Sequence, residues 1–222
     1  MGKRWPICIK TWILQSTSEV KLPVQLSVRL KLLFYGIFLI PFLWLMFLVF
    51  TSGLGANPVE KVIHTTGDWA LNFMMLTLTI TPLCRITGWS WPAGLRRTAG
   101  LFCFFYAIIH FFTYIILDQG LSWEFIAADV VKYKRIAVGF ASLLLLIPAA
   151  VTSTAGMVRR LGQKRWKTIQ STVYAAAVCS VVHYLWLVKI DMIRPLIYAA
   201  VLAVLLGYRL FVYVLEKTAN RS

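Results

Sequence analysis

Two histidines inside long apolar stretches are the residues of this sequence best suited to chemistry. His110 stands in the aromatic run FFYAIIHFF, and His183 stands in VVHYLW. Ionisable residues are rare within membranes because burying charge in lipid is costly, so each one requires a reason. Neutral imidazole is a good iron ligand, and two imidazoles on one iron give a six-coordinate haem suited to electron transfer.

The two histidines are predicted to lie at matching depth. Each lies about 11 residues into its apolar stretch, which corresponds to about 16 Å from the inner edge of a helix. Two imidazoles at one depth on different helices could bind one iron from opposite faces. Each could instead hydrogen-bond a neighbouring helix, and the residue pattern alone leaves both interpretations open. The aromatic residues near His110 would suit the wall of a porphyrin site, or simple packing: Phe104, Phe105, Tyr106, Phe111 and Phe112.

The composition excludes an ordinary soluble domain. Apolar side chains make up 59% of the 222 residues and charged ones only 14%, whereas soluble chains are nearer a quarter charged. The net charge of +15 does not indicate nucleic-acid binding, because the basic residues lie between the apolar runs as cytoplasmic loops do. We predict an all-α membrane bundle of six transmembrane helices, each of roughly 20 residues, at 33–54, 69–86, 99–118, 136–153, 172–188 and 195–215.

Lysine and arginine set the predicted orientation. One side has 17 of them and the other has six, and six of the eight acidic residues fall on the second side. By the positive-inside rule both termini are cytoplasmic. The larger group includes Arg209, assigned with Lys217 to the C-terminal end. The expected division is a basic cytoplasmic segment at 1–32, the transmembrane domain at 33–215 and a cytoplasmic tail at 216–222.

Smaller features follow from the same pattern. The outer segment 121–133 has apolar residues at near-helical spacing, which predicts a short helix in the membrane interface. Pro195 suits the first turn of the last helix, where its missing N–H costs nothing. His64 is expected in the outer loop or first turn before the second span. We favour an interfacial histidine with a capping role there, over a peripheral haem contact or an alternative ligand.

Two other classes of function compete with the redox interpretation. A small membrane transporter could use His110 and His183 as a proton relay without haem. Transporters usually show internal repeats and broken helices, and the sequence shows no evident repeat and no predicted intramembrane Asp or Glu. A haem-free assembly partner for a periplasmic enzyme is the third class.

A set of short stretches across residues 34–215 resembles one family. It comprises 67–71 (GDWAL), 95–101 (LRRTAGL), 105–107 (FYA), 152–162 (TSTAGMVRRLG) and 183–186 (HYLW), with Trp166 and Tyr174. Together these stretches closely resemble the MsrQ (YedZ) family of the ferric-reductase-like transmembrane group.

The resemblance implies a haem b subunit of the bacterial inner membrane. Such a subunit passes electrons from the quinone pool or a flavin reductase to MsrP, a periplasmic molybdopterin enzyme that reduces methionine sulfoxide in oxidised proteins. His110 and His183 would then be the axial haem ligands. The family is also described as binding FMN. The chain would be an electron-transfer subunit and not an enzyme on its own.

The sequence departs from the family pattern at its inner side. Gln170 stands thirteen residues before His183, where the family usually has a histidine, and Arg96 stands fourteen residues before His110. Neither is a haem ligand, so we expect one haem rather than two. Arg159 and Arg160, with Arg96 and Arg97, could hold a flavin phosphate because arginine suits bidentate phosphate contacts. The positive-inside rule alone would also account for these arginines on the cytoplasmic side.

Overall fold

The computed structural model describes residues 28–188 and 191–219, and every regular element in these ranges is helical. The predicted all-α class is therefore confirmed. A short 3₁₀ turn, Trp91–Leu95, leads into α4, and a π turn, Tyr114–Asp118, follows it. The α-helices are α2 (Val28–Phe50), α3 (Pro58–Thr87), α4 (Arg96–Thr113), α5 (Trp123–Lys132), α6 (Lys134–Val151), α7 (Ala155–Gln170), α8 (Thr172–Leu187) and α9 (Ile193–Ala219).

Five helical segments in the described ranges are long and apolar enough to cross a membrane. They are Arg29–Phe50, Pro58–Thr87, Trp91–Asp118, Lys134–Val151 and Ile193–Ala219. The fifth predicted span corresponds to α8, which is helical but has only 16 residues, or about 24 Å of rise. The chain is thus a multi-pass membrane protein, and the sixth span stays a prediction.

Helix α3 begins eleven residues earlier than the sequence predicted. Asn57 caps it by accepting the Glu60 N–H, and Pro58 occupies its first turn, where proline costs no hydrogen bond. Because the first turns of α3 are polar, the hydropathy pattern does not reveal that the helix begins at Pro58. His64 consequently lies within the second turn of α3 rather than in a loop. Asp68, which we had placed outside the span, also lies within this helix and is one-third exposed.

The inner segment that we expected to be a loop is the helix α7. Thr154 caps it by accepting the Met157 N–H at 3.2 Å. Gly162, with φ of +74°, interrupts it in a conformation that favours glycine. The indole N–H of Trp166 donates to the Thr152 carbonyl at 3.0 Å and ties α7 to the end of α6. By contrast, the short helix predicted at 121–133 is confirmed as α5, and Pro195 does lie in the first turn of α9.

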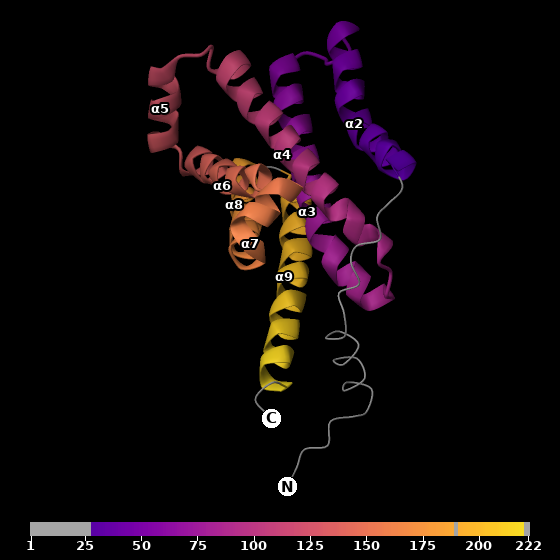
Figure 1. Cartoon of the computed structure of the whole chain (residues 1–222). Coiled ribbons are helices and arrows are strands. Elements are labelled where there is room, and N and C mark those ends of the chain that lie inside the picture. Colours follow the sequence, from indigo (N-terminus) through magenta and orange to yellow (C-terminus); the bar gives the residue numbers. More distant parts are fainter. Residues whose placement is uncertain (1–27, 189–190, 220–222) are drawn as a thin grey trace.

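Two antiparallel helix pairs form the frame of the bundle. Helix α3 packs along α4, and α6 packs along α8, while α4 also contacts α6 (Figure 1). Helix α2 covers α3 and α4, and α9 contacts α3 and α8. Contacts near the helix ends agree with the predicted two-sided arrangement. Arg85 pairs with Glu216 at 3.4 Å on the predicted inner side, and Arg194 lies 4.0 Å from Asp68 on the predicted outer side.

One buried tyrosine connects α4 to α2 beside a proline. Pro41 lies inside α2, and the next residue, Phe42, donates its N–H to the Tyr106 hydroxyl at 3.0 Å. The same hydroxyl donates to the Phe38 carbonyl at 3.0 Å. Tyr106 therefore bridges two backbone groups that would otherwise bond each other in a regular helix. It is 1% exposed, so no solvent can replace it.

We predict that Tyr106→Phe lowers the unfolding free energy by about 1–2 kcal/mol, because it leaves two backbone groups of α2 without their bridge. Thermal unfolding in detergent should show a melting temperature lower by roughly 2–4 °C. Tyr213→Phe is the matched control, because Tyr213 is 59% exposed and should tolerate the change. An unchanged melting temperature for Tyr106→Phe would contradict this role.

Candidate functional site

The structure brings His110 and His183 together. Their ring centroids lie 6.3 Å apart and their planes are nearly perpendicular, at 82°. His110 comes from α4 and His183 from α8, so each belongs to a different helix pair. The two histidines that the sequence analysis singled out therefore lie side by side, and their shared role as metal ligands stays a prediction.

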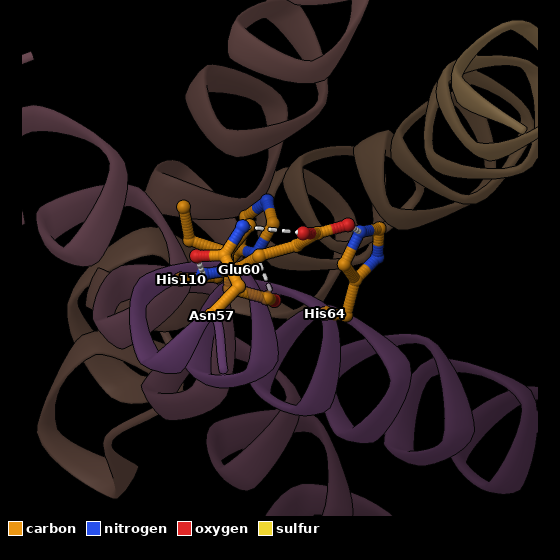
Figure 2. A network of polar contacts seen from close by, with 5 residues as sticks. Asn57, Glu60, His64 and His110 are labelled. Atoms are coloured by element: carbon orange, nitrogen blue, oxygen red, sulfur yellow. Dashed lines mark hydrogen bonds and ion pairs between the residues drawn. The ribbon is translucent and has the colours of Figure 1, made fainter. Parts of the chain in front are cut away.

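The ring of His110 is held against α3. Its Nδ1 lies 2.9 Å from the Ile63 carbonyl oxygen (Figure 2). The ring packs directly on Gly67, where an added Cβ would lie 3.1 Å from Nδ1. Real Cβ contacts are seldom this short, so the glycine makes room for the imidazole.

The ring of His183 is held against α6 in the same way. Its Nδ1 lies 2.7 Å from the Arg135 carbonyl oxygen. A Cβ at Gly139 would lie 2.6 Å from Nδ1, which is too close for any side chain. The fit at this position is therefore tighter than the fit at Gly67.

The two half-sites repeat one arrangement. In each, a backbone carbonyl accepts from the imidazole, and a glycine four residues later leaves space for the ring. The carbonyl and the glycine recur 72 residues further along the chain, from Ile63 to Arg135 and from Gly67 to Gly139. Residues four apart lie on one face of a helix, so each carbonyl–glycine pair forms a fixed seat for one histidine.

The hydrogen bonds determine which nitrogen of each ring is available. A carbonyl oxygen can only accept, so Nδ1 of a neutral ring carries the hydrogen and Nε2 carries a free lone pair. Neither Nε2 makes a hydrogen bond within the described ranges. Metal-bound histidines commonly donate their second ring N–H to a carbonyl in this way.

The spacing of the rings fits a single metal ion between them. A metal–nitrogen bond of about 2 Å, plus roughly 1 Å from nitrogen to ring centre, puts the centres of two opposed imidazoles about 6 Å apart. The observed centroid distance is 6.3 Å. The chain therefore presents two oriented imidazoles at the separation that bis-histidine haem ligation requires.

The aromatic residues near His110 divide between two roles. Phe105 packs edge-on against Phe42 of α2, with ring centroids 5.4 Å apart, and Tyr106 bonds the backbone of α2. These two therefore face the α2 interface. Phe111 instead approaches Phe140 of α6 at 5.7 Å, so it joins the two helix pairs near the histidines.

His64 does not join the pair. Its Nε2 lies 3.6 Å from a Glu60 oxygen, and its side chain is 47% exposed. The other Glu60 oxygen accepts from the Asn57 amide at 2.6 Å. Figure 2 shows Glu60 between Asn57 and His64 in the first turns of α3. Asn57 caps this helix end, and the interfacial, capping role that we favoured for His64 stays a prediction.

The arginines predicted to hold a flavin phosphate lie on the surface. Arg159 and Arg160 are both exposed on α7. Gln170 has a structural role, since its amide donates to the Ala149 carbonyl at 2.9 Å and to the Thr152 hydroxyl at 3.1 Å. At the inner side, Gln170 thus ties α7 to α6 instead of presenting a metal ligand.

Several residues of the site were missed by the sequence reasoning. Gly67 and Gly139 carried a signal, because glycine inside a helix costs about 1 kcal/mol and needs a reason. The Ile63 and Arg135 carbonyls carried none, because a backbone acceptor is independent of residue type. The sequence also contained no sign of the contacts that Arg209 makes from within α9. Arg209 donates to the Tyr174 hydroxyl at 2.6 Å and to the Leu78 carbonyl at 2.9 Å.

Comparison with known proteins defines the class and then the family. The ferric reductase like transmembrane component family matches residues 66–181, a range that includes His110 and ends two residues before His183. A Rhodospirillum rubrum protein, named protein-methionine-sulfoxide reductase heme-binding subunit MsrQ, is 46% identical over 83% of this chain and 88% of its own length. Proteins of the same name from Herminiimonas arsenicoxydans and Azospira oryzae are 45% and 44% identical, over 85% and 84% of this chain and 87% and 80% of their own lengths. The chain belongs to the MsrQ family.

Alanine substitutions at the two glycines are expected to destabilise the protein to different extents. Gly139→Ala should destabilise the protein by about 1–3 kcal/mol, because the new methyl group forces His183 off its carbonyl. Gly67→Ala should cost less, since its contact is longer. Gly207 of α9 is the control, because nothing lies within 4 Å of its Cβ position, and alanine there should be neutral or stabilise by about 0.5–1 kcal/mol. Melting temperatures in detergent measure this order, and equal effects at Gly139 and Gly207 would contradict it.

Proposed function

We propose that this chain is the haem b electron-transfer subunit of a methionine sulfoxide reductase system, with His110 and His183 as axial ligands. The observation that carries this proposal is the pair of imidazoles 6.3 Å apart, each with Nδ1 hydrogen-bonded to a backbone carbonyl. Haem supplies reversible one-electron chemistry when it is bound. The names of the relatives, which call them haem-binding subunits, support the same function.

The residues of this chain determine how such a haem would be held. The Ile63 and Arg135 carbonyls orient the rings and keep the ligating nitrogens deprotonated. Two histidine ligands occupy both axial positions, which favours electron transfer over oxygen chemistry. A proton relay through the same histidines is less well supported, because each Nδ1 is already committed to a carbonyl and would have to leave it to pass a proton.

The position of the pair favours delivery of electrons to the outer side. His110 lies fourteen residues after the start of α4 but only eight before Asp118, or about 21 Å and 12 Å along the helix axis. We propose six spans, with α8 as the short one, and cytoplasmic termini in the inner membrane. The outer face would then reduce the periplasmic partner MsrP.

The electron donor must act from the inner side or from the lipid. The quinone pool or a cytoplasmic flavin reductase fits this requirement. FMN would carry the electrons across the distance between the inner membrane face and the haem. No histidine takes the inner positions of Gln170 and Arg96, which supports one haem rather than two. The proposed cytoplasmic parts are 1–32 and 216–222, of which 1–27 and 220–222 lie outside the described residues.

The haem proposal predicts a red protein with one haem per chain. His110→Ala and His183→Ala should each abolish the dithionite-reducible low-spin spectrum, because each removes an axial ligand. His64→Ala is the matched control and should keep most of the spectrum, since that ring pairs with Glu60. A pyridine haemochrome assay on purified protein measures the stoichiometry. A wild-type protein free of porphyrin would refute the proposal.

The flavin proposal has a separate test. If Arg159 and Arg160 hold the FMN phosphate, the double change to glutamate should lower bound flavin several-fold, because it replaces attraction by repulsion. Fluorescence of flavin released from purified protein measures this content. Arg165→Glu provides a charge-reversal control on the same helix. Unchanged flavin content in the double variant would mean that the two arginines contribute only to the orientation of the chain in the membrane.

A further inference from the structure

A basic groove lies beside His183 at the junction of α5 and α6. Its volume is about 250 Å³, and it is lined by Lys132, Tyr133, Lys134, Arg135 and Trp186. Helix α5 ends at Lys132 and α6 begins at Lys134. The extended backbone of Tyr133, with φ of −111° and ψ of 101°, separates the two helices. The turn thus concentrates three cationic residues within four positions.

The cations of this groove have no carboxylate partner in the described part of the chain. The three ion pairs found there involve other residues. The Lys132 ammonium and the Arg135 guanidinium instead lie over the Tyr133 ring, 5.3 Å and 4.5 Å from its centroid. Arg135 is half-buried, and charges in such positions are normally paired. The groove is therefore suited to an anion.

The groove is directly connected to the histidine pair. The carbonyl that accepts from His183 belongs to Arg135 itself. Trp186, which lines the groove, follows His183 by three residues on α8 and so lies on a neighbouring part of the same helix face.

A cofactor held by His183 could itself supply the anionic group for this groove. Only the His183 ring would separate a metal on Nε2 from the Arg135 carbonyl. A porphyrin held there would have an edge that the Arg135 side chain could reach. The anionic groups of haem b are its two propionates, which lie together on one edge.

We propose that this groove binds the haem propionates, with Arg135 as the principal cation and Lys134 and Lys132 as supporting ones. The inference rests on the proposed haem function. It orients the propionate edge toward the predicted outer face. Arg135 then has two roles. Its carbonyl positions the His183 ring, and its side chain neutralises the negative charge of the propionates. A nearby cation also favours the haem state that has gained an electron.

The test uses the full-length haem-loaded protein. Arg135→Gln removes the charge but keeps the carbonyl, so the low-spin spectrum should remain while the midpoint potential becomes more negative. Arg135→Lys should restore most of the potential. Arg194→Gln is the matched control, because Arg194 is an outer arginine with a 70% exposed side chain, and it should leave the potential close to that of the wild type.

A second arm identifies the anion. The full chain made without haem is loaded with either protohaem or its dimethyl ester, whose propionates carry no charge. Wild type should bind protohaem more tightly than the ester. The Arg135→Gln protein should bind the two about equally well, because the ester and the substitution remove the same interaction.

The outcomes separate this inference from the proposed function. A wild-type chain that binds no haem overturns both. A haem-loaded Arg135→Gln protein with an unchanged potential overturns the propionate site alone. A preference for protohaem over the ester that is equally large in the Arg135→Gln protein shows that the arginine does not bind the propionates. A shift produced by adding phosphatidylglycerol vesicles, and insensitive to the ester, would assign the groove to lipid phosphate and likewise overturn the proposal.

Discussion

The hydrogen bond from an imidazole to a helix carbonyl is the interaction on which this site depends. A helical carbonyl already accepts one backbone bond but has a second lone pair, which His110 and His183 use at Ile63 and Arg135. The bond forms only where the ring can approach the helix closely, and glycine permits this because it has no Cβ. Since a carbonyl does not titrate at physiological pH, the tautomer of each ring is fixed whatever the protonation of the surroundings.

The distance between the rings is set by the packing of the two helix pairs. Each pair builds its own half-site, α3 with α4 and α6 with α8, and the contact of α4 with α6 brings the halves together. The same seat thus occurs twice in the chain, although no repeat is evident in the sequence. The repeated elements are a glycine and a backbone oxygen, and only the glycine is specified by residue type. A structural repeat can therefore exist with almost no sequence similarity between its halves.

The sequence predicts the apolar helices and the histidines, because long apolar runs and intramembrane ionisable residues are strong signals. It places His110 and His183 correctly as a close pair, since equal depth on two helices follows from counting residues. It does not predict the early start of α3, because Glu60, Lys61 and His64 make those turns polar. It misses α7 for a similar reason, since a basic amphipathic helix at the interface has no long apolar run. It also does not reveal that Arg209 contacts Tyr174 and Leu78 from within α9, because those partners are distant in the sequence.

The membrane interior explains why backbone carbonyls serve as acceptors throughout this chain. Polar side chains in lipid need partners, and acidic side chains there would themselves be costly. Tyr106, Arg209 and Ser142 each donate to a carbonyl of a neighbouring helix, at Phe38, Leu78 and Ala176. The histidine seats follow the same rule. A carboxylate acceptor could itself take up a proton, whereas these carbonyls stay neutral. The groups that position the two imidazoles therefore keep one charge state.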